Sequence, residues 1–292
     1  MSKNFVIIGT AGYIAPRHLR AIKDTGNNLI AATDPHDSVG ILDSYFSECA
    51  YFKEFERFDR HIEKIRDTEN AINYVSVCSP NYLHDAHIRF ALRANACAIC
   101  EKPLVLKSKN CDALLDAEQR YNKKVYSILQ LRLHPDIINL KNKIDKSKDF
   151  HNINVSYITP RGKWYLYSWK GNEEQSGGLI TNIGIHLFDM LIWIFGDVEK
   201  IEIQEKKKEK ICGKLYLERA KVNWRLSIDK KDLPNLNMRT YRSIKLNGEE
   251  IEFSNGFTDL HTKSYLEILE GRGYGIKEAM SSIELVEKIK NL

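Results

Sequence analysis

Residues 5–15 read Phe-Val-Ile-Ile-Gly-Thr-Ala-Gly-Tyr-Ile-Ala, an apolar run that leads directly into a glycine-rich turn. Gly9 and Gly12 allow a tight bend and leave the backbone unshielded, and small Ala15 stands where a helix would meet the strand. About twenty residues further on, a second apolar run ends at Asp34, where a carboxylate can accept hydrogen bonds from a ribose. This stretch predicts a strand, a dinucleotide-binding turn and a helix, the first part of a parallel α/β fold.

The same turn favours NAD as the cofactor, because the carboxylate of Asp34 would repel the 2′-phosphate of NADP. We expect Tyr13 and Ile14 to line the cofactor, whose phosphate charge would lie at the N-terminus of the following helix. Arg17 and His18 fall in the first turn of that helix, where they either contact phosphate or face solvent.

The composition is that of an ordinary globular protein of about two domains. The 292 residues are 43% hydrophobic and 28% charged, which excludes a disordered chain or a coiled coil. The 44 basic and 39 acidic residues leave a net charge of +5, which suits an anionic small substrate and is too weak to predict nucleic-acid binding. The apolar run at residues 5–8 is too short for a signal peptide, so we expect a soluble, cytoplasmic enzyme.

Two segments suggest a membrane or metal role that their context does not support. The apolar window 178–196 carries Asn182, His186 and Asp189 on one helix face, which a membrane-spanning helix would rarely tolerate. Cys97-x-x-Cys100 flanks a buried strand without a second ligand pair, so we expect a structural role for these cysteines and no metal site. The chain has only six cysteines, and we expect no disulfide framework.

The first part of the chain alternates short apolar runs with helical spacings. The apolar runs, rich in Val, Ile, Tyr and Cys, are residues 4–9, 28–34, 72–79, 96–101 and 124–131. Apolar spacings of three and four fall between them, at residues 16–25, 55–67, 83–94 and 108–121. Buried strands that alternate with helices predict a doubly wound parallel sheet, a Rossmann domain, which we place at residues 1–124.

Residues 125–292 predict an α+β domain with a mostly antiparallel open sheet. Strand-like segments occur at residues 153–159, 198–204, 215–228 and 244–253, and the charged run 205–210 predicts a solvated turn. Asn247-Gly248 divides the last segment into the two arms of a type I′ hairpin. We expect helices at residues 134–144, 178–195, 259–269 and 276–290.

Polar motifs follow two strands at the carboxyl edge of the predicted parallel sheet, where open α/β folds bind ligands. The fourth strand leads into Ser79-Pro-Asn81-x-x-His84 and the fifth into Glu101-Lys102-Pro103. In the second domain, Asn182-x-Gly-x-His186-x-x-Asp189 follows a pair of glycines. In this order the motifs resemble the Gfo/Idh/MocA family of sugar and cyclitol oxidoreductases, and the resemblance extends over essentially the whole chain.

The resemblance implies a role for each matching position. Together with the glycine turn, it assigns the cofactor to Gly9, Gly12, Tyr13, Ile14, Asp34, Ser79, Asn81, His84, Glu101 and Lys102. It places Lys102 and His186 beside the nicotinamide, in a cleft between the two domains. Asn182 stands where many members have Asp; it could hydrogen-bond the sugar, but it cannot stabilise an imidazolium as a carboxylate does.

Oxidation of a hydroxyl group needs a base within hydrogen-bond reach and a cation beside the developing alkoxide. Two assignments follow for the implied catalytic pair. Either His186 accepts the hydroxyl proton while Lys102 holds the oxygen, or Lys102 has a lowered pKa and is itself the base.

Four further stretches resemble one subgroup of this family, the bacterial UDP-N-acetylglucosaminuronate 3-dehydrogenases of surface-polysaccharide (lipopolysaccharide O-antigen) pathways. They are residues 12–18, 21–27, 55–61 and 130–135. This resemblance implies NAD-dependent oxidation of the C3 hydroxyl of a UDP-sugar before a partner aminotransferase installs an amine. It also implies a homodimer or homotetramer, and 2-oxoglutarate as a candidate acceptor for the reoxidation of NADH.

A UDP-uronate carries a diphosphate and a carboxylate, which planar guanidinium groups bind well. We therefore expect Arg132 and Arg161 to contact substrate, together with Lys102, Asn182 and His186. The aromatic residues at 164–169 either stack on the substrate or pack in the core or a dimer interface. The alternatives are another sugar dehydrogenase or 3-ketoreductase of the family, for instance one acting on UDP-N-acetylglucosamine, and a non-catalytic NAD-binding regulator, against which the intact Lys102 and His186 argue.

Overall fold

The computed structural model describes residues 2–292, which form two compact units, each with one six-stranded sheet. The first unit contains the chain up to Ile128 together with Asp259–Ala279. The second contains Leu129–Thr258 and Met280–Leu292. The first unit therefore ends a few residues beyond the expected position 124, and a segment from near the C-terminus returns to it.

The first unit is a doubly wound parallel sheet. Its strand order is β3-β2-β1-β4-β5-β6, with every neighbouring pair parallel. The strands are β1 Asn4–Ile8, β2 Asn28–Thr33, β3 Ala50–Phe52, β4 Tyr74–Val77, β5 Cys97–Cys100 and β6 Val125–Ser127. The predicted Rossmann fold is confirmed. Strand β3 was not predicted, because its three half-buried apolar residues are too short a run to be recognised as a strand.

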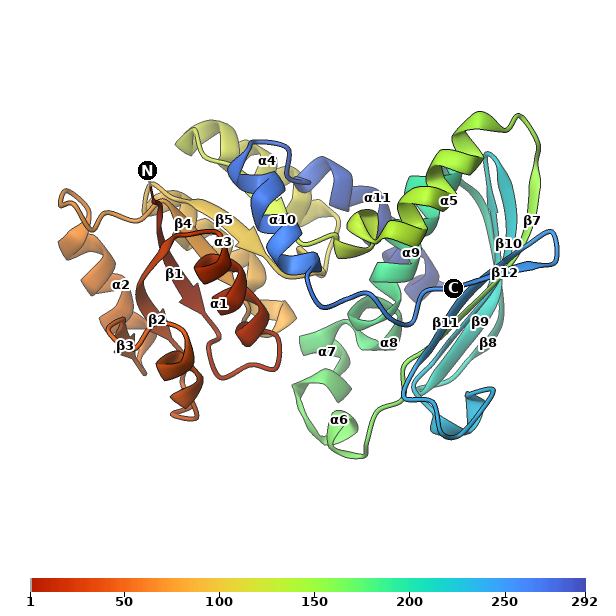
Figure 1. Ribbon diagram of the computed structural model, residues 1–292, viewed down its shortest axis with the longest axis horizontal. Coiled ribbons are helices and arrows are strands. Elements are labelled where there is room, and N and C mark those ends of the chain that lie inside the picture. The colour runs from red at the N-terminus through yellow and green to blue at the C-terminus, as the bar shows by residue number, and fades with distance from the viewer. Residues whose placement is uncertain (1) are drawn as a thin grey trace. The chain divides into compact units, whose positions relative to one another are not determined.

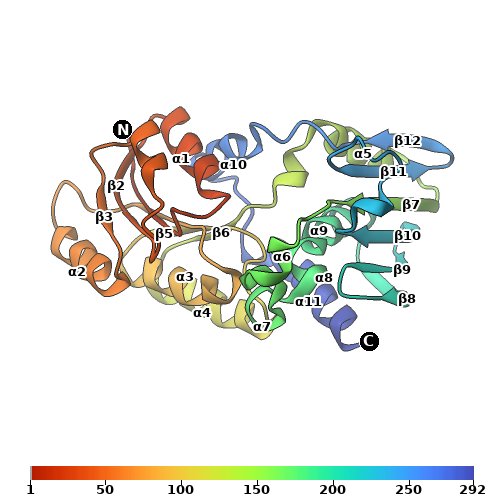
Figure 2. The ribbon, with the colours of Figure 1, turned by 90° about the horizontal axis from the view of Figure 1, so that it is seen from below.

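Helices cover both faces of this sheet. They are α1 Ala15–Asp24, α2 Phe55–Ile65, α3 His84–Arg93, α4 Lys109–Tyr121 and α10 Leu260–Leu269, with short 3-10 turns η1 Gly40–Ser44 and η2 Asn81–Leu83. Figure 2 shows α1 and α10 on one face, and α3 and α4 on the other. In Figure 1 the blue α10 lies beside the red α1, although about 240 residues of chain separate them. The returning segment also reaches the sheet edge, where the Ser127 N–H donates to the Tyr274 carbonyl at 2.9 Å.

The second unit is a mixed, mostly antiparallel sheet in the order β12-β11-β7-β10-β9-β8. Only β7 and β10 run parallel to each other. The strands are β7 His151–Ile158, β8 Val198–Lys206, β9 Lys210–Leu217, β10 Ala220–Ser227, β11 Tyr241–Leu246 and β12 Glu249–Glu252. This confirms the predicted class. Asn247 and Gly248 have φ values of 52° and 90°, the left-handed conformations that the predicted hairpin turn requires.

Two predicted segments of the second unit are wrong in detail. Residues 215–228 do not form one strand, because the chain turns at Glu218 and Arg219 between β9 and β10. The charged run 205–210 is partly strand, since β8 continues to Lys206 before the turn.

The helices of the second unit are η3 Gln130–Leu133, α5 Pro135–Lys146, α6 Trp164–Tyr167, η4 Trp169–Gly171, α7 Glu173–Ser176, α8 Gly178–Asn182, α9 Gly184–Phe195 and η5 Lys230–Asp232. Of these, α5 and α9 lie beside the sheet in Figure 1. The last helix, α11 Ile276–Asn291, begins in the first unit and ends in the second. Phe188 of α9 packs edge-on against Trp224 of β10, with ring centroids 5.1 Å apart.

The predicted helix at residues 178–195 is two helices that meet at Ile183. The segments Glu173–Asn182 and Gly184–Phe195 are bent by 45°. Asn182 therefore ends one helix while His186 and Asp189 belong to the next, so the three polar side chains do not share one regular helix face. Within residues 2–292, no single helix is both long enough and apolar enough to cross a membrane. This bent pair meets the two criteria only when its halves are counted together.

Candidate functional site

The turn after β1 can only be built with glycine at residue 9. Gly9 has φ +92°, and a Cβ at this position would lie 2.6 Å from the carbonyl carbon of Cys78. A Cβ on Gly12 would lie 3.1 Å from the carbonyl oxygen of Gly9, closer than side chains ordinarily approach. The backbone of this loop therefore packs closely against the end of β4. Because glycine has no side chain, the opposite side of the loop backbone is left uncovered.

The bare loop presents backbone donors at the start of α1. The N–H groups of Tyr13 and Ile14 donate no hydrogen bond to any residue between 2 and 292, and Pro16 at the first turn has no N–H to offer. Unpaired N–H groups and the helix dipole together favour a negatively charged group at this position. The side chain of Tyr13 is 81% exposed and does not cover the loop.

Asp34 lies at the carboxyl end of β2 and is held in place by two backbone donors. Its Oδ2 accepts the Ala11 N–H and its Oδ1 accepts the His36 N–H, both at 2.9 Å. Each carboxylate oxygen keeps a lone pair, so the buried group can still accept hydrogen bonds from two ribose hydroxyls. The glycine turn and its free N–H groups fit the diphosphate of NAD, and the fixed carboxylate fits the hydroxyls of its adenosine ribose.

The loop after β4 is fastened to the loop after β5 by His84. The buried His84 ring lies between two carbonyl oxygens, with Nε2 2.8 Å from that of Ser79 and Nδ1 2.7 Å from that of Pro103. Burial lowers the pKa of His84, while its hydrogen bonds to these two carbonyls oppose that shift. His84 thus supports the two loops, and its contact with the cofactor stays a prediction.

Ser79 and Asn81 are buried at the same loop, where we expected the middle of the cofactor. The Ser79 Oγ lies 2.8 Å from Nδ1 of His87, whose ring stacks on Phe55 at 5.0 Å. Burial lowers the pKa of His87 to about 4, which keeps that ring neutral. The Ser79 hydroxyl is therefore oriented by α3.

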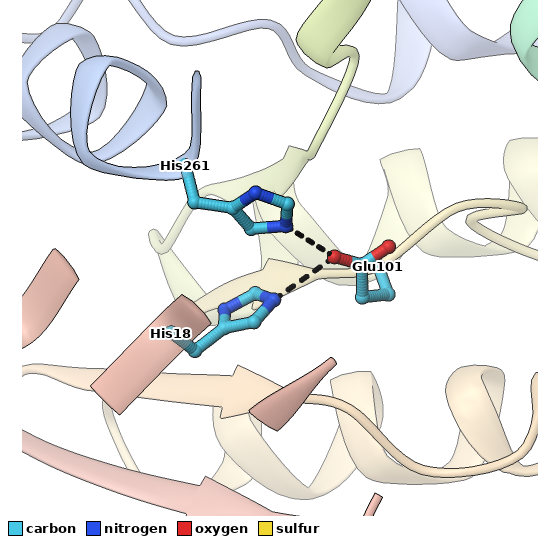
Figure 3. Close-up of side chains that lie close together, drawn as sticks. All are labelled: His18, Glu101 and His261. Carbon is cyan, nitrogen blue, oxygen red and sulfur yellow. Dashed lines mark hydrogen bonds and ion pairs between the residues drawn. The ribbon is translucent and has the colours of Figure 1, made fainter. Parts of the chain in front are cut away.

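Glu101 is buried at the end of β5 and contacts two histidines. Its Oε1 lies 3.0 Å from Nε2 of His18 and 2.8 Å from Nε2 of His261 (Figure 3). His18 is fully buried, so it neither faces solvent nor lies at the exposed mouth of the glycine turn. Its partnership with His261 was missed in the sequence, where the one available signal was His261 and Tyr265 spaced four apart on a helix.

The two predicted catalytic residues belong to different units. Lys102 follows Glu101 in the loop after β5 and is half-buried. His186 lies in the first turn of α9 in the second unit and is also half-buried. Neither unit by itself contains both residues.

Asn182 is paired with a tyrosine that the sequence did not single out. The Asn182 Nδ2 donates to the Tyr165 hydroxyl at 2.7 Å, and both side chains are buried. Burial raises the pKa of Tyr165, so the phenol stays neutral and keeps its own proton to donate.

Arg132 and Arg161, both predicted to bind substrate, lie in contrasting environments. Arg132 is buried and makes a bidentate pair with Asp189, at 3.1 Å from Nε to Oδ2 and 2.7 Å from Nη2 to Oδ1. That edge of the guanidinium is taken up in joining η3 to α9. Arg161 is exposed after β7, and its Nη1 donates to the carbonyls of Thr159 and Pro160. Of the two, Arg161 is the better placed to meet an anion.

Comparison with known proteins agrees with this geometry. Residues 3–128 match the NAD-binding Rossmann-fold domain of the Gfo/Idh/MocA oxidoreductases, and residues 143–220 match their C-terminal α/β domain. The curated glucose-6-phosphate 3-dehydrogenase of Bacillus subtilis is 26% identical over 204 residues, 66% of this chain and 54% of that protein. The chain thus spans about half the length of the curated relatives that it matches.

Two solved structures of the WlbA (WbpB) dehydrogenase from Thermus thermophilus are similar over the whole chain. The one in complex with NAD and α-ketoglutarate is 47% identical with a TM-score of 0.94, covering 97% of this chain and 93% of that one. The one in complex with NAD and UDP-GlcNAcA is 45% identical with a TM-score of 0.96, covering 100% and 95%.

Proposed function

This chain belongs to the Gfo/Idh/MocA family of oxidoreductases, and we propose that it uses NAD to oxidise the C3 hydroxyl of UDP-N-acetylglucosaminuronate to the 3-keto sugar. The observation that carries the proposal is the 45% identity, over the full chain, to a Thermus thermophilus dehydrogenase crystallised with NAD and UDP-GlcNAcA. The carboxylate of Asp34 and the bare glycine turn support the choice of NAD.

The proposed cofactor, when bound, supplies the two-electron oxidant. The protein must then remove one proton from the C3 hydroxyl and stabilise the negative charge that develops on the oxygen. His186 and Lys102 are the groups we assign to these tasks, and the base is either His186 or a Lys102 of lowered pKa. Asn182, which donates to the Tyr165 hydroxyl, is the residue we assign to a hydrogen bond with the sugar.

The uronate part of the proposal depends on cations that can bind a carboxylate or diphosphate. Arg161 is the main candidate, and Arg132 is a weaker one because Asp189 already occupies one edge of its guanidinium. Lys170, whose ammonium lies 5.3 Å from the Trp164 ring centroid and 5.5 Å from that of Trp169, adds a cation among aromatic faces that suit a nucleotide.

We extend the proposal to the biological setting of the reaction. A 3-keto sugar is the substrate that an aminotransferase needs, so the product would pass to such a partner in lipopolysaccharide O-antigen synthesis. We place the reaction in the cytoplasm and the enzyme in a homodimer or homotetramer. Reoxidation of NADH by 2-oxoglutarate is supported by the Thermus thermophilus dehydrogenase crystallised with NAD and α-ketoglutarate.

The test is an assay of purified protein with NAD and UDP-N-acetylglucosaminuronate, with and without 2-oxoglutarate. NADH absorbance without the oxo-acid would indicate a dehydrogenase that releases its cofactor. Equal amounts of 3-keto sugar and 2-hydroxyglutarate, without net NADH, would indicate recycling of bound cofactor. If folded, NAD-bound protein leaves the uronate unchanged but oxidises UDP-N-acetylglucosamine, the uronate assignment is wrong; if it oxidises neither, the enzyme assignment fails.

A further inference from the structure

A buried carboxylate and two buried imidazoles meet inside the first unit (Figure 3). The side chains of His18, Glu101 and His261 are 0%, 9% and 2% exposed. They come from α1, the end of β5 and α10, and Glu101 is separated from the two histidines by 83 and 160 residues of chain. Such a contact is made only when the returning segment 259–279 packs on the Rossmann sheet.

The hydrogen bonds of the cluster fix which ring nitrogens carry protons. Because Oε1 of the Glu101 carboxylate is an acceptor, His18 and His261 must both donate from Nε2. Nδ1 of His18 lies 2.7 Å from the Tyr265 hydroxyl, which in turn lies 2.7 Å from the Ser76 hydroxyl. Nδ1 of His261 is buried and has no hydrogen-bond partner anywhere in residues 2–292, as expected of a neutral ring with its lone pair on that atom.

The two imidazoles keep the carboxylate ionised. Burial alone would raise the pKa of Glu101, but the hydrogen bonds from His18 and His261 outweigh it and hold the pKa well below its usual range. Burial lowers the pKa of His261, so that ring stays neutral while it donates. The Glu101 carboxylate is therefore ionised and accepts a hydrogen bond from each ring.

Only one carboxylate oxygen of Glu101, Oε1, accepts hydrogen bonds from the two histidines. Its Oε2 points away from both rings in Figure 3 and accepts no hydrogen bond from the described part of the chain. This oxygen is not among the fully buried atoms that lack a partner, so it can be reached. Fixing Oε1 thus sets the direction in which Oε2 presents its lone pairs.

We infer that His18 and His261 are positioning residues for the dinucleotide: they orient Glu101 so that Oε2 accepts a hydrogen bond from a ribose hydroxyl of the cofactor. The inference rests on the NAD binding in the proposed function and not on the identity of the sugar. It makes α10, a helix close to the C-terminus, part of the cofactor site of the Rossmann unit.

The same three side chains could in principle hold a metal ion, since their ligand atoms lie within 4.8 Å of one another. The direct Nε2 to Oε1 distances of 2.8 and 3.0 Å are ordinary hydrogen bonds and account for the geometry without an ion. Metal binding is therefore an outcome that the experiment must be able to reveal.

The test is calorimetric titration of NAD into His261→Leu and His261→Gln between about pH 5 and about pH 8. Leu removes the donor, and we expect NAD to bind about tenfold more weakly because Glu101 is then held by His18 alone. Gln keeps an N–H donor without titrating, so binding should stay within about threefold of the parent protein at each pH. His151→Leu is the matched control, because His151 is a buried histidine of the second unit and its loss should leave NAD binding unchanged.

The other groups around Glu101 are unchanged in every variant, so a loss of NAD affinity is read against the same surroundings. Burial raises the pKa values of the Cys78 and Cys100 thiols and of Tyr265 well above their usual ranges. Burial lowers the pKa of His84, which also interacts with Glu101. The nearby cations, Lys102 in the adjoining position and Arg17 facing His261, are present in every variant.

Glu101→Gln gives a second test that does not require the Leu variant to fold. Its amide oxygen still accepts from both histidines, but its NH₂ group replaces the accepting Oε2, so NAD should bind more weakly by the same factor at every pH. Unchanged NAD affinity in His261→Leu and Glu101→Gln, both folded, would overturn the inference. So would a stoichiometric metal in the purified protein whose removal by EDTA weakens NAD binding. If the parent protein does not bind NAD, the proposed function fails too, whereas failure to oxidise the sugar with NAD binding intact leaves this inference standing.

Discussion

Lys102 and His186 are the residues on which the proposed oxidation depends. We expect Lys102→Ala and His186→Ala each to lower kcat by roughly 10²–10⁴-fold, the usual contribution of a general base or of an oxyanion-stabilising cation. Turnover of a C3-deuterated sugar would show whether the chemical step is the one that slows. The pH profile of kcat separates the two assignments, because its acidic limb is lost with the residue that acts as base. Near-normal turnover in both variants would rule out the pair.

Gly9 shows how a single atom constrains the cofactor turn. Gly9→Ala places a Cβ 2.6 Å from the Cys78 carbonyl carbon at φ +92°, so both conformational strain and a backbone clash oppose folding. Gly26→Ala is the matched control, since Gly26 has φ +71° and nothing within 4 Å of its Cβ position. We expect Gly26→Ala to cost about 1 kcal/mol in urea unfolding and Gly9→Ala at least about 3 kcal/mol. Equal losses would mean that the clash is relieved by local movement.

His87 makes the first unit sensitive to acid. Its pKa is lowered by burial from 6.5 to about 4, so the unfolded chain binds this proton more readily than the folded one. The resulting stability is complete above pH 6.5 and is lost as the pH falls toward 4. His87→Phe keeps the aromatic stacking on Phe55 and removes the titration. We expect thermal melts of this variant to lose less stability between these pH values than the parent; a parallel decline would contradict the assignment.

Among the elements, η3 and α9 are joined by the buried pair of Arg132 and Asp189. Asp189→Asn would leave the Arg132 guanidinium buried without its counter-charge, and we expect a loss of about 3–5 kcal/mol in unfolding free energy. The exposed pair of Lys143 and Glu249 is the control, since Glu249→Gln should cost at most about 1 kcal/mol. Comparable costs for the two substitutions would show that water reaches Arg132 in the folded protein.

Elements with a clear period were predictable, and those decided by packing were not. Period-three and period-four spacings located α1 to α4, and continuous apolar runs located β1, β2, β4, β5 and β6. The break at Ile183 was not predicted because the apolar pattern continues through it, and the one local signal, Gly184, is also tolerated inside helices. The turn at Glu218 and Arg219 was missed for a related reason, since neither residue is a typical hairpin residue.

The candidate site divides in the same way. Gly9, Gly12 and Asp34 could be predicted because the cofactor turn is local and its spacing is fixed by one strand and one helix. The pairing of Glu101 with His18 and His261, and of Asn182 with Tyr165, depends on long-range packing that no local pattern records. The pair of Arg132 with Asp189 was likewise absent from the sequence pattern, and the contact of Arg132 with substrate stays a prediction.

At the scale of the whole molecule, the chain leaves the Rossmann unit after Ile128 and returns to it at Asp259. The family's cofactor motifs all precede that exit, yet the buried partners of Phe5, Ser76 and His18 include Tyr265 from the return. The core of the first unit is therefore completed by a segment that follows the second unit in the sequence.

Tyr265 tests this dependence. It is fully buried, with its ring 5.8 Å from that of Phe5 and its hydroxyl bonded to His18 and Ser76, so Tyr265→Ala should cost about 3–5 kcal/mol. All four tryptophans, Trp164, Trp169, Trp193 and Trp224, lie in the second unit, so their fluorescence reports its unfolding, whereas NAD binding reports the first. We expect the Tyr265→Ala variant to lose NAD binding at a lower urea concentration than the one at which its tryptophan fluorescence changes. Leu266→Ala is the control, because Leu266 is half-exposed on the same helix, and we expect both of its transitions to stay close to those of the parent protein. If the two probes instead shift together, the units unfold as one cooperative body and the returning segment is what couples them; if Tyr265→Ala behaves like Leu266→Ala, the first unit does not depend on the return.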